Sequence, residues 1–272
     1  SNLLAIFYET PFRSTSGEIL LETLAQIPSR ANGGLRLAPV TVQRGQTVVD
    51  AEGTLAVFQP GLRVRPSGCQ EAACTVVWDG ETSLQMDQMT ADFELQEALT
   101  WSDGTPVLAG DSIFSFQLAD APEAPGLHWA EDRTETYQAV DLQKVQWVGR
   151  PGLITGDLSQ FFWTPLPAHL FSGEEGWDEM ADGEALSFSP LSYGPFMIHD
   201  RRPDQLHLIA NPHYYRVDEG LPLLDEILYQ EIEGGRDGAL QAIQSGQCDV
   251  LDASFGWEND PDLLSALEAD GR

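Results

Sequence analysis

The chain has 272 residues, of which 42% are hydrophobic, and its 14 basic and 43 acidic residues give a formal net charge of −29. A chain of this length buries roughly three quarters of its unfolded surface, as one large domain or two ordinary ones. The charge repels phosphate backbones and anionic membranes, which excludes nucleic acid as a partner, and we attribute it to solubility in a salty or extracellular medium. The sequence contains no run of eighteen apolar residues, so it predicts no membrane-spanning helix.

The chain is predicted to begin with a strand followed by a helix. Residues 3–8 form a short apolar run that ends in a polar segment, as a buried strand does. Thr15 and Glu18 fit the capping-box pattern ahead of apolar residues at helical spacing over 20–25. We therefore expect a helix that ends at Pro28.

From about residue 40 to residue 101 the pattern is typical of β-structure. A hairpin turn is predicted at residues 51–53, because a turn sequence there separates two apolar runs. The predicted strands of the middle of the chain are residues 47–50, 54–58, 75–78, 92–96, 137–140 and 144–148.

Two of the three cysteines lie close together in a loop-like stretch. Cys69 and Cys74 have four residues between them, a spacing that allows a small disulfide-closed loop and suits an oxidising compartment. Two free thiols are the alternative, whereas a zinc site lacks further ligands nearby. Cys248 is interpreted as a small buried apolar residue rather than a nucleophile.

The last third of the chain mixes strands with a helix. Residues 195–199 and 205–209 flank a short turn, so we expect them to pair antiparallel. A strand over 224–229, a helix over 237–244 stopped by a left-handed Gly246, and a strand over 248–251 are expected next. The fold class is therefore mixed α/β with an inserted β-rich region.

Enzyme motifs are missing from the sequence: it has no nucleophile elbow, His-Glu-x-x-His, phosphate loop or dinucleotide fingerprint. With 43 acidic residues, no carboxylate pair can be singled out as acid and base. His199 and His207 could face one another across the predicted hairpin. Strand-surface histidines without a nearby Cys or carboxylate are usually plain surface residues, so no metal site and no cofactor are predicted.

One segment is much more specific. Residues 98–116, which contain Trp101-Ser102-Asp103-Gly104 followed by an aromatic helix, resemble the signature of family 5 extracytoplasmic solute-binding proteins. These are the oligopeptide, dipeptide and nickel-binding receptors of ABC importers. Leu108 stands where the family has a Thr helix cap, and Gly110 where it has an acidic residue. The first helical turn should be weaker by about 1 kcal/mol for a lost cap, unless Asp111 substitutes.

Further segments resemble the same family in the expected order along the chain. They are Pro167-Ala168-His169-Leu170, Ser192-Tyr193-Gly194-Pro195-Phe196, Asn211-Pro212-His213-Tyr214-Tyr215, Leu224-Asp225-Glu226-Ile227 and Ser245-Gly246-Gln247-Cys248-Asp249. We interpret these motifs as mainly core and turn residues, which identify the fold rather than the binding site.

The resemblance implies a periplasmic-binding-protein-like (type II) clamshell lobe, with a mixed sheet, flanking helices and an inserted β-rich domain. Residues 1–44 and 186–272 would form the sheet domain of lobe I, and residues 45–185 the inserted additional domain. Family members are about twice as long, so we expect this chain to be the N-terminal lobe, without the second lobe.

Ligand should meet the strand ends that face the cleft. Glu9 is expected to pair with a ligand amine, and Phe255 or Trp257 to stack on a ligand side chain. An ordinary loop or hinge role is the alternative for every candidate. The candidate ligand-binding residues are Tyr8, Glu9, Thr10, Tyr193, Asp252, Ser254, Phe255 and Trp257.

The resemblance also implies a function. The protein is expected to be an extracytoplasmic, lipid-anchored receptor that captures a peptide or similar small solute without catalysis and delivers it to ABC permease subunits. A ligand-sensing module coupled to a signalling partner is the alternative. An enzyme with its site on this lobe is a third interpretation, for which the sequence offers no catalytic set. The exposed cleft face could also pair two copies of the chain.

Overall fold

The computed structural model describes residues 7–15, 18–69, 71–122, 124, 126–171 and 191–251, and omits the side chains of residues 13–15, 18 and 19. Most of the strand predicted at residues 3–8 lies outside these ranges. Within them, the helices are all too short or too polar to cross a bilayer.

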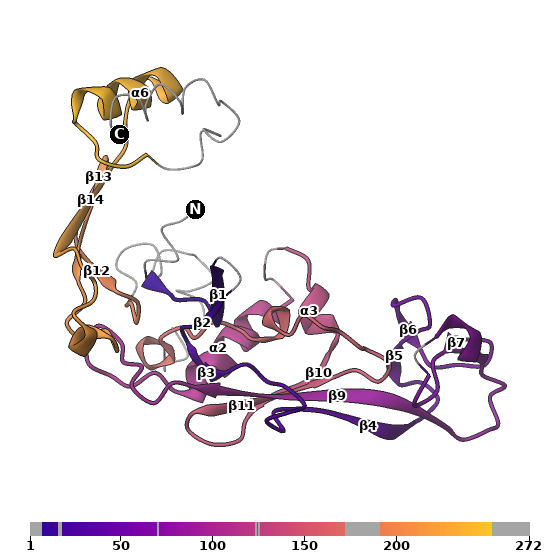
Figure 1. The fold of residues 1–272 in the computed structure, drawn as a ribbon. Helices are drawn as coiled ribbons and strands as arrows, with labels where there is room; N and C mark the ends of the chain where they lie inside the picture. Colours follow the sequence, from indigo (N-terminus) through magenta and orange to yellow (C-terminus); the bar gives the residue numbers. More distant parts are fainter. Residues whose placement is uncertain are drawn as a thin grey trace.

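A five-stranded antiparallel sheet forms the body of the molecule (Figure 1). Its central strand β9 (Leu84–Leu95) pairs with β11 (Lys144–Gly149) along one edge, and β10 (Thr134–Ala139) continues the sheet beyond β11. The other edge of β9 pairs with β3 (Leu24–Gln26) and β4 (Leu35–Val42). Because side chains alternate along a strand, the buried residues from Met89 to Leu95 fall on one face of β9, whereas the buried Met86 belongs to a separate core. The buried residues of this face are Met89, Ala91, Phe93 and Leu95.

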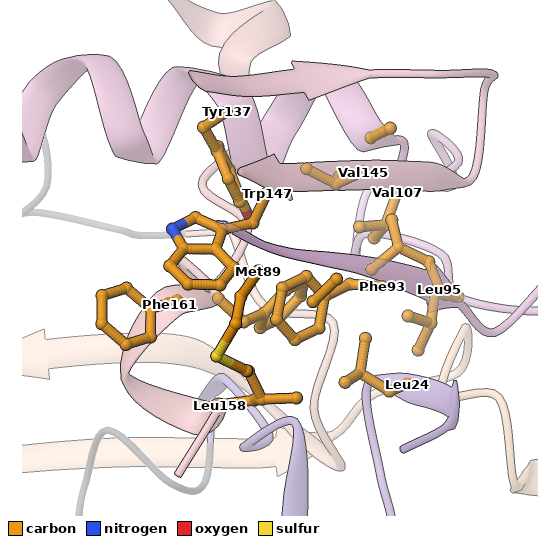
Figure 2. Packing of buried hydrophobic residues seen from close by; sticks show 14 of the residues in the cluster. Leu24, Met89, Phe93, Leu95, Val107, Tyr137, Val145, Trp147, Leu158 and Phe161 are labelled. Atoms are coloured by element: carbon orange, nitrogen blue, oxygen red, sulfur yellow. The ribbon is translucent and has the colours of Figure 1, made fainter. Parts of the chain in front are cut away.

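The main hydrophobic core lies against this face (Figure 2). The Trp147 ring packs on Phe161, with ring centroids 4.4 Å apart, and its indole Nε1 donates a 2.9 Å hydrogen bond to Thr134 Oγ1. Phe93 packs on Phe162 with centroids 5.3 Å apart. Trp147 and Phe93 lie in strands that were predicted from the sequence, whereas Phe161 and Phe162 lie outside the predicted elements. Burial of their apolar surface stabilises the fold by about 25 cal/mol per Å².

Helix α2 (Ala109–Ala119) covers this core and begins at Leu108. Leu108 cannot accept a side-chain hydrogen bond, but the Asp111 carboxylate accepts one from the Leu108 backbone N–H at 2.9 Å. It also accepts hydrogen bonds from Trp101 Nε1 at 3.2 Å and from the Ala168 N–H at 3.0 Å. Asp111 therefore substitutes for the missing cap, which was the open alternative for this helix.

The predicted hairpin around residues 51–53 is confirmed as β5 (Thr47–Val49) and β6 (Leu55–Val57). A second small ribbon pairs β7 (Arg63–Val64) with β8 (Val76–Val77), where the strand at 75–78 was predicted. A separate core fills this part of the molecule, in which Phe58 stacks on Trp78 with centroids 4.1 Å apart.

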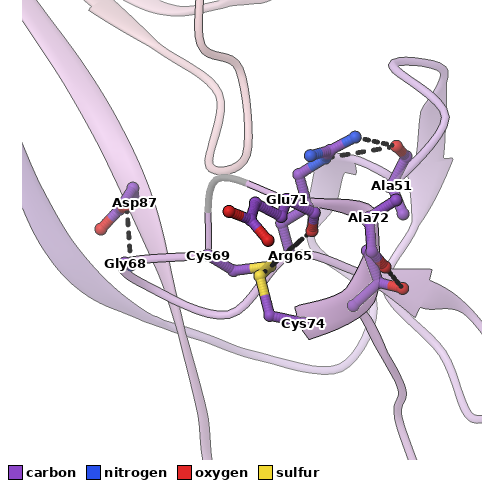
Figure 3. The surroundings of a disulfide bond; sticks show 9 residues. Ala51, Arg65, Gly68, Cys69, Glu71, Ala72, Cys74 and Asp87 are labelled. Carbon is purple, nitrogen blue, oxygen red and sulfur yellow. Dashed lines mark hydrogen bonds between the residues drawn. A yellow bond between two sulfur atoms is a disulfide. The ribbon is translucent and has the colours of Figure 1, made fainter.

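The predicted disulfide joins Cys69 to Cys74 in the loop between β7 and β8 (Figure 3). The short helical turn η1 (Ala72–Cys74) brings the two cysteines together. On the other side of the loop, the Gly68 N–H donates a 2.9 Å hydrogen bond to the Asp87 carboxylate on β9. The disulfide alternative, rather than two free thiols, is therefore the state of this structure.

The helix predicted between Thr15 and Pro28 is wrong, because this segment folds as strands. Strand β1 (Phe12–Thr15) pairs with β2 (Glu18–Leu21), and β3 follows. Thr15 and Glu18, the expected capping box, are cross-strand partners of β1 and β2. Leu24 is fully buried and pairs with Leu95 of β9. Tertiary pairing with β9 overrides the local helical spacing.

The C-terminal part forms an arm on one side of the body (Figure 1). Strands β12 (Phe196–Arg202), β13 (Gln205–Ala210) and β14 (Glu226–Gln230) make an antiparallel sheet, as predicted for the hairpin. Helix α6 (Gly235–Ser245) follows, and Gly246 ends it with a φ of 74°. The strand predicted at residues 248–251 is wrong: this segment has no regular structure, and Val250 is 83% exposed.

The remaining helices and turns are short. They are α3 (Trp129–Asp132), η2 (Ser159–Phe161), η3 (Ala168–Leu170) and η4 (Val217–Glu219). The predicted domain boundary after residue 44 falls just beyond β4, yet β4 pairs along its whole length with β9 of the predicted inserted domain. The division into residues 1–44 with 186–272, and 45–185, stays a prediction.

Candidate ligand-binding site

The segment from Phe7 to Thr10 meets residues that lie far along the chain. The Phe7 carbonyl accepts hydrogen bonds from the Tyr193 N–H at 3.2 Å and the Gly194 N–H at 2.9 Å. The Ser192 hydroxyl donates to the same carbonyl at 2.8 Å. These bonds fasten the predicted N-terminal site residues to the turn that precedes β12, so Tyr8, Glu9, Thr10 and Tyr193 are brought together.

Glu9 lies at the centre of this cluster and is only 5% exposed. Its Oε1 accepts a 2.6 Å hydrogen bond from the Tyr214 hydroxyl. Its backbone carbonyl accepts bonds from Thr23 Oγ1 at 2.8 Å and from the Tyr193 hydroxyl at 3.1 Å. Burial, followed by the hydrogen bond to the Glu9 carboxylate, raises the pKa of Tyr214 above its ordinary value. The Glu9 carboxylate is therefore held in a fixed position inside the protein.

Thr10 binds a second buried carboxylate. Its backbone N–H and its hydroxyl both donate to Glu22 Oε2, at 3.1 and 2.7 Å. Glu22 is 5% exposed, whereas Thr10 is exposed. Two buried acidic side chains, Glu9 and Glu22, thus lie at this site, whereas most of the other acidic residues that the structure describes are partly or fully exposed.

Tyr8 is the candidate whose side chain has an unused hydrogen-bonding group. Its ring packs against Tyr193 and Trp101, with centroids 5.7 and 6.4 Å away. Its hydroxyl is buried and has no hydrogen-bond partner within the described part of the chain. Burial raises the pKa of Tyr8 to about 12. A buried hydroxyl without a partner costs about 1–3 kcal/mol, and a bound ligand can remove that cost.

Tyr193 lies deeper than a cleft residue would. It is fully buried, and its ring packs edge-on against Trp101 with centroids 5.2 Å apart. Burial raises its pKa above the ordinary range for tyrosine. Tyr193 is part of the core in this structure, so direct contact with a ligand would require the core to open, and its role stays a prediction.

The other candidates, Asp252, Ser254, Phe255 and Trp257, lie outside the described residues. Sequence reasoning did not single out Glu22, Thr23 or Tyr214, although all three contact the candidate residues. Tyr214 belongs to a motif that we interpreted as core and turn. Its spacing alone gave no sign of its partner, because contact with Glu9 depends on the fold.

A hollow in the described structure lies elsewhere, between the β13–β14 end of the arm and α6. It has a volume of about 630 Å³ and a polar, acidic lining that includes Asp204, Glu231 and Glu233. It contains none of the predicted site residues. The Tyr8 cluster suits a ligand better than this hollow does, because ligand pockets are mostly apolar with a few placed polar groups.

Comparison with known families gives a match over most of the chain. The sequence profile described as "Bacterial extracellular solute-binding proteins, family 5 Middle" matches residues 80–267. This range contains β9, α2 and the whole arm. A search of curated proteins found no match to the sequence.

Solved structures with the same fold extend this finding. An oligopeptide-binding protein from Thermus thermophilus, complexed with a pentapeptide, aligns with a TM-score of 0.59 and 15% identity over 91% of this chain and 39% of its own. A putative peptide-binding protein AppA from Clostridium difficile gives 0.51 and 14%, over 90% and 39%. MoaA from A. tumefaciens, in complex with mannopinic acid, gives 0.51 and 19%, over 91% and 39%. This chain spans about two fifths of the length of these proteins.

Proposed function

We propose that this chain, which belongs to the bacterial extracellular solute-binding proteins of family 5, forms one side of a receptor that captures a small solute. It has the type II periplasmic-binding-protein fold, built here from antiparallel sheets and few helices. The observation that carries the proposal is the family match over residues 80–267. The function is binding without chemistry, and the captured solute is handed to the membrane subunits of an ABC importer outside the cytoplasm.

The solute class that we propose is peptide. Two of the similar structures are an oligopeptide-binding protein with a bound pentapeptide and a putative peptide-binding protein. A peptide presents amide groups and a charged terminus, which suit a site with a few polar groups on an aromatic wall. In this chain the aromatic residue of the wall is Tyr8, which packs on the buried rings of Trp101 and Tyr193. The polar groups are the Tyr8 hydroxyl and the fixed Glu9 carboxylate.

Capture is expected to depend on more than this chain alone, since the similar proteins are far longer. A ligand that contacts two lobes at once favours the closed state by its differential affinity for that state. We therefore expect residues 1–272 to supply one set of contacts, and the affinity of these contacts by themselves to be low.

The experiment is a titration of the full-length protein with a pool of synthetic tripeptides and pentapeptides, followed by calorimetry and thermal unfolding. Binding should raise Tm as peptide is added, because a ligand specific to the folded state stabilises it. Tyr8→Phe should weaken peptide binding, yet it should raise Tm of the peptide-free protein by about 2 °C, since it removes a buried hydroxyl without a partner.

Tyr229→Phe is the matched control, because Tyr229 is 39% exposed and lies on β14, away from the cluster. It should leave both Tm and peptide binding unchanged. If no peptide binds but a small carboxylate solute does, the receptor function stands and the peptide class is wrong. If neither the peptides nor the small carboxylate solutes bind or shift Tm, the receptor function itself is contradicted.

A further inference from the structure

The arm brings two histidines together on adjacent strands. His207 on β13 is opposite Asp200 of β12, and a β-bulge between Ile198 and Asp200 inserts His199 beside it. The imidazole rings of His199 and His207 meet edge to face, with centroids 5.1 Å apart. A bulge of this kind re-aims one side chain, and here it turns His199 toward His207.

A carboxylate from the third strand completes the group. Glu226 of β14 holds His207 through a 2.9 Å contact between Glu226 Oε2 and His207 Nε2. A carboxylate only accepts hydrogen bonds, so Nε2 carries the proton, and Nδ1 of the neutral ring keeps its lone pair. Metal-binding histidines commonly have their second ring nitrogen held by a carboxylate in this way. The sequence argument against a metal site was the lack of such a carboxylate, and the fold supplies it.

The distance between the rings suits a shared metal ion. A Zn–N bond of about 2.0–2.1 Å puts the centroid of each ring about 3.2 Å from the metal, so two rings at a tetrahedral angle have centroids about 5 Å apart. The observed 5.1 Å agrees with this spacing. His199 is exposed and His207 partly exposed, so an ion can reach both.

Neighbouring groups define what kind of ion fits. Among the described residues, no group of three or more His, Cys, Asp or Glu side chains could hold a metal ion. The two histidines would therefore be the protein's only ligands to an ion here, and water would take its remaining positions. Asp200 is occupied by Arg202, whose Nε donates to it at 3.0 Å. Imidazole nitrogens favour zinc, copper and nickel over calcium and magnesium, which prefer oxygen. The net charge of −29 also concentrates cations near the surface.

We propose that His199 and His207, with Glu226 orienting His207, form a surface site on the arm for a divalent transition-metal ion such as Zn²⁺. The site is separate from the Tyr8 cluster. An ion bound there would join β12 to β13 through their side chains and stiffen the arm.

The test is a calorimetric titration of the full-length protein with Zn²⁺ in millimolar Ca²⁺, which saturates the weak carboxylate sites. One Zn²⁺ per chain should bind, and His199→Ala and His207→Ala should each weaken binding at least tenfold. Glu226→Gln should weaken it by about 10–100-fold, as loss of an outer partner does. His128→Ala, which replaces a histidine outside the arm, is the matched control and should bind Zn²⁺ normally.

Nuclear magnetic resonance gives a second readout that does not depend on affinity. Of the five histidines, His199 and His207 should show shifted ring signals with Zn²⁺, and the signals of the other three should stay in place. Circular dichroism of each variant checks that it folds. The proposal is overturned if Zn²⁺ does not bind above the Ca²⁺ background, or if both His→Ala variants bind it as the wild type does.

Discussion

The Tyr214 hydroxyl donates a 2.6 Å hydrogen bond to the Glu9 carboxylate across a sequence separation of 205 residues. This buried contact joins the N-terminal segment to the connection between β13 and β14, at the centre of the candidate site. It connects two residues whose positions in the sequence give no hint of each other. Because the contact is buried, the loss of one of its hydrogen-bond partners should change the free energy of unfolding by a measurable amount.

Tyr214→Phe removes a hydrogen bond to a buried carboxylate. The free energy of unfolding should fall by about 1–3 kcal/mol, because Glu9 stays buried and loses a strong donor. Urea unfolding measures the change, with the exposed Tyr229→Phe as the control. An unfolding midpoint equal to that of the wild type would show that Tyr214 does not stabilise Glu9.

Alkaline pH should destabilise the protein through its buried tyrosines. Burial raises the pKa of Tyr8 to about 12, whereas an unfolded tyrosine ionises near pH 10. Tyr8 thus adds no pH dependence to the unfolding free energy well below pH 10. Between pH 10 and pH 12 it ionises more readily in the unfolded chain, which lowers the unfolding free energy by up to about 1.4 kcal/mol per pH unit. Tyr8→Phe should therefore reduce the fall in unfolding free energy over this range. An identical fall in the wild type and the variant would contradict the burial of Tyr8.

Asp111→Ala should weaken the start of α2. Asp111 accepts three hydrogen bonds, from Leu108, Trp101 and Ala168, and the variant leaves these donors without it. We expect a loss of about 2–4 kcal/mol in unfolding free energy. Asp120→Ala, at the exposed other end of the helix, should be neutral or slightly stabilising, since a negative charge there opposes the helix dipole. Equal effects of the two substitutions would refute the capping role.

Gly152→Ala should destabilise the junction between the main sheet and the β5–β6 hairpin. Gly152 has a φ of +90°, and an added Cβ would collide with the Val49 carbonyl oxygen and lie 2.6 Å from Met86 Cε. The expected loss is roughly 2–5 kcal/mol, from the unfavourable backbone and the overlap. Gly156→Ala is the matched control, because an added Cβ there meets nothing within 4 Å. Thermal unfolding of both variants decides the matter, and similar Tm values would disprove the steric argument.

Thiol counting tests the Cys69–Cys74 bond directly. In denaturant, a thiol reagent should detect one cysteine per chain, Cys248, before reduction and three afterwards. Three reactive thiols in the unreduced protein would mean that the disulfide is absent. Removal of the bond is expected to cost about 2 kcal/mol for so short a loop.

The sequence patterns correctly predicted those hairpins and helices that depend on residues close together in the chain. The hairpins at residues 47–58 and 196–210, and helix α6 with Gly246 as its stop, follow from turn residues and apolar spacing within a few positions. The helix prediction for the segment from Thr15 to Pro28 was wrong because the apolar spacing of this segment fits a helix as well as strands. Pairing of Leu24 with β9, some 70 residues later, decides between the two, and no local pattern reports that pairing.

The candidate site was predictable only in part. Tyr8, Glu9 and Thr10 were expected because they follow the first predicted strand, and the fold gathers them with Tyr193. The depth of Tyr193 could not be foreseen, because burial depends on Trp101 and Tyr8 packing around it in three dimensions.

The bond between Ser192 and the Phe7 carbonyl spans 185 residues, and this has a consequence for how the protein is made. At typical rates of synthesis, the ribosome needs about 10–40 s to deliver Ser192 after Phe7 has emerged. During that interval the start of the chain has no native partner there, and Glu9 remains hydrated. The contact between Ser192 and Phe7 thus forms late in biogenesis. A chaperone that shields the N-terminal segment would act before the arm has been synthesised.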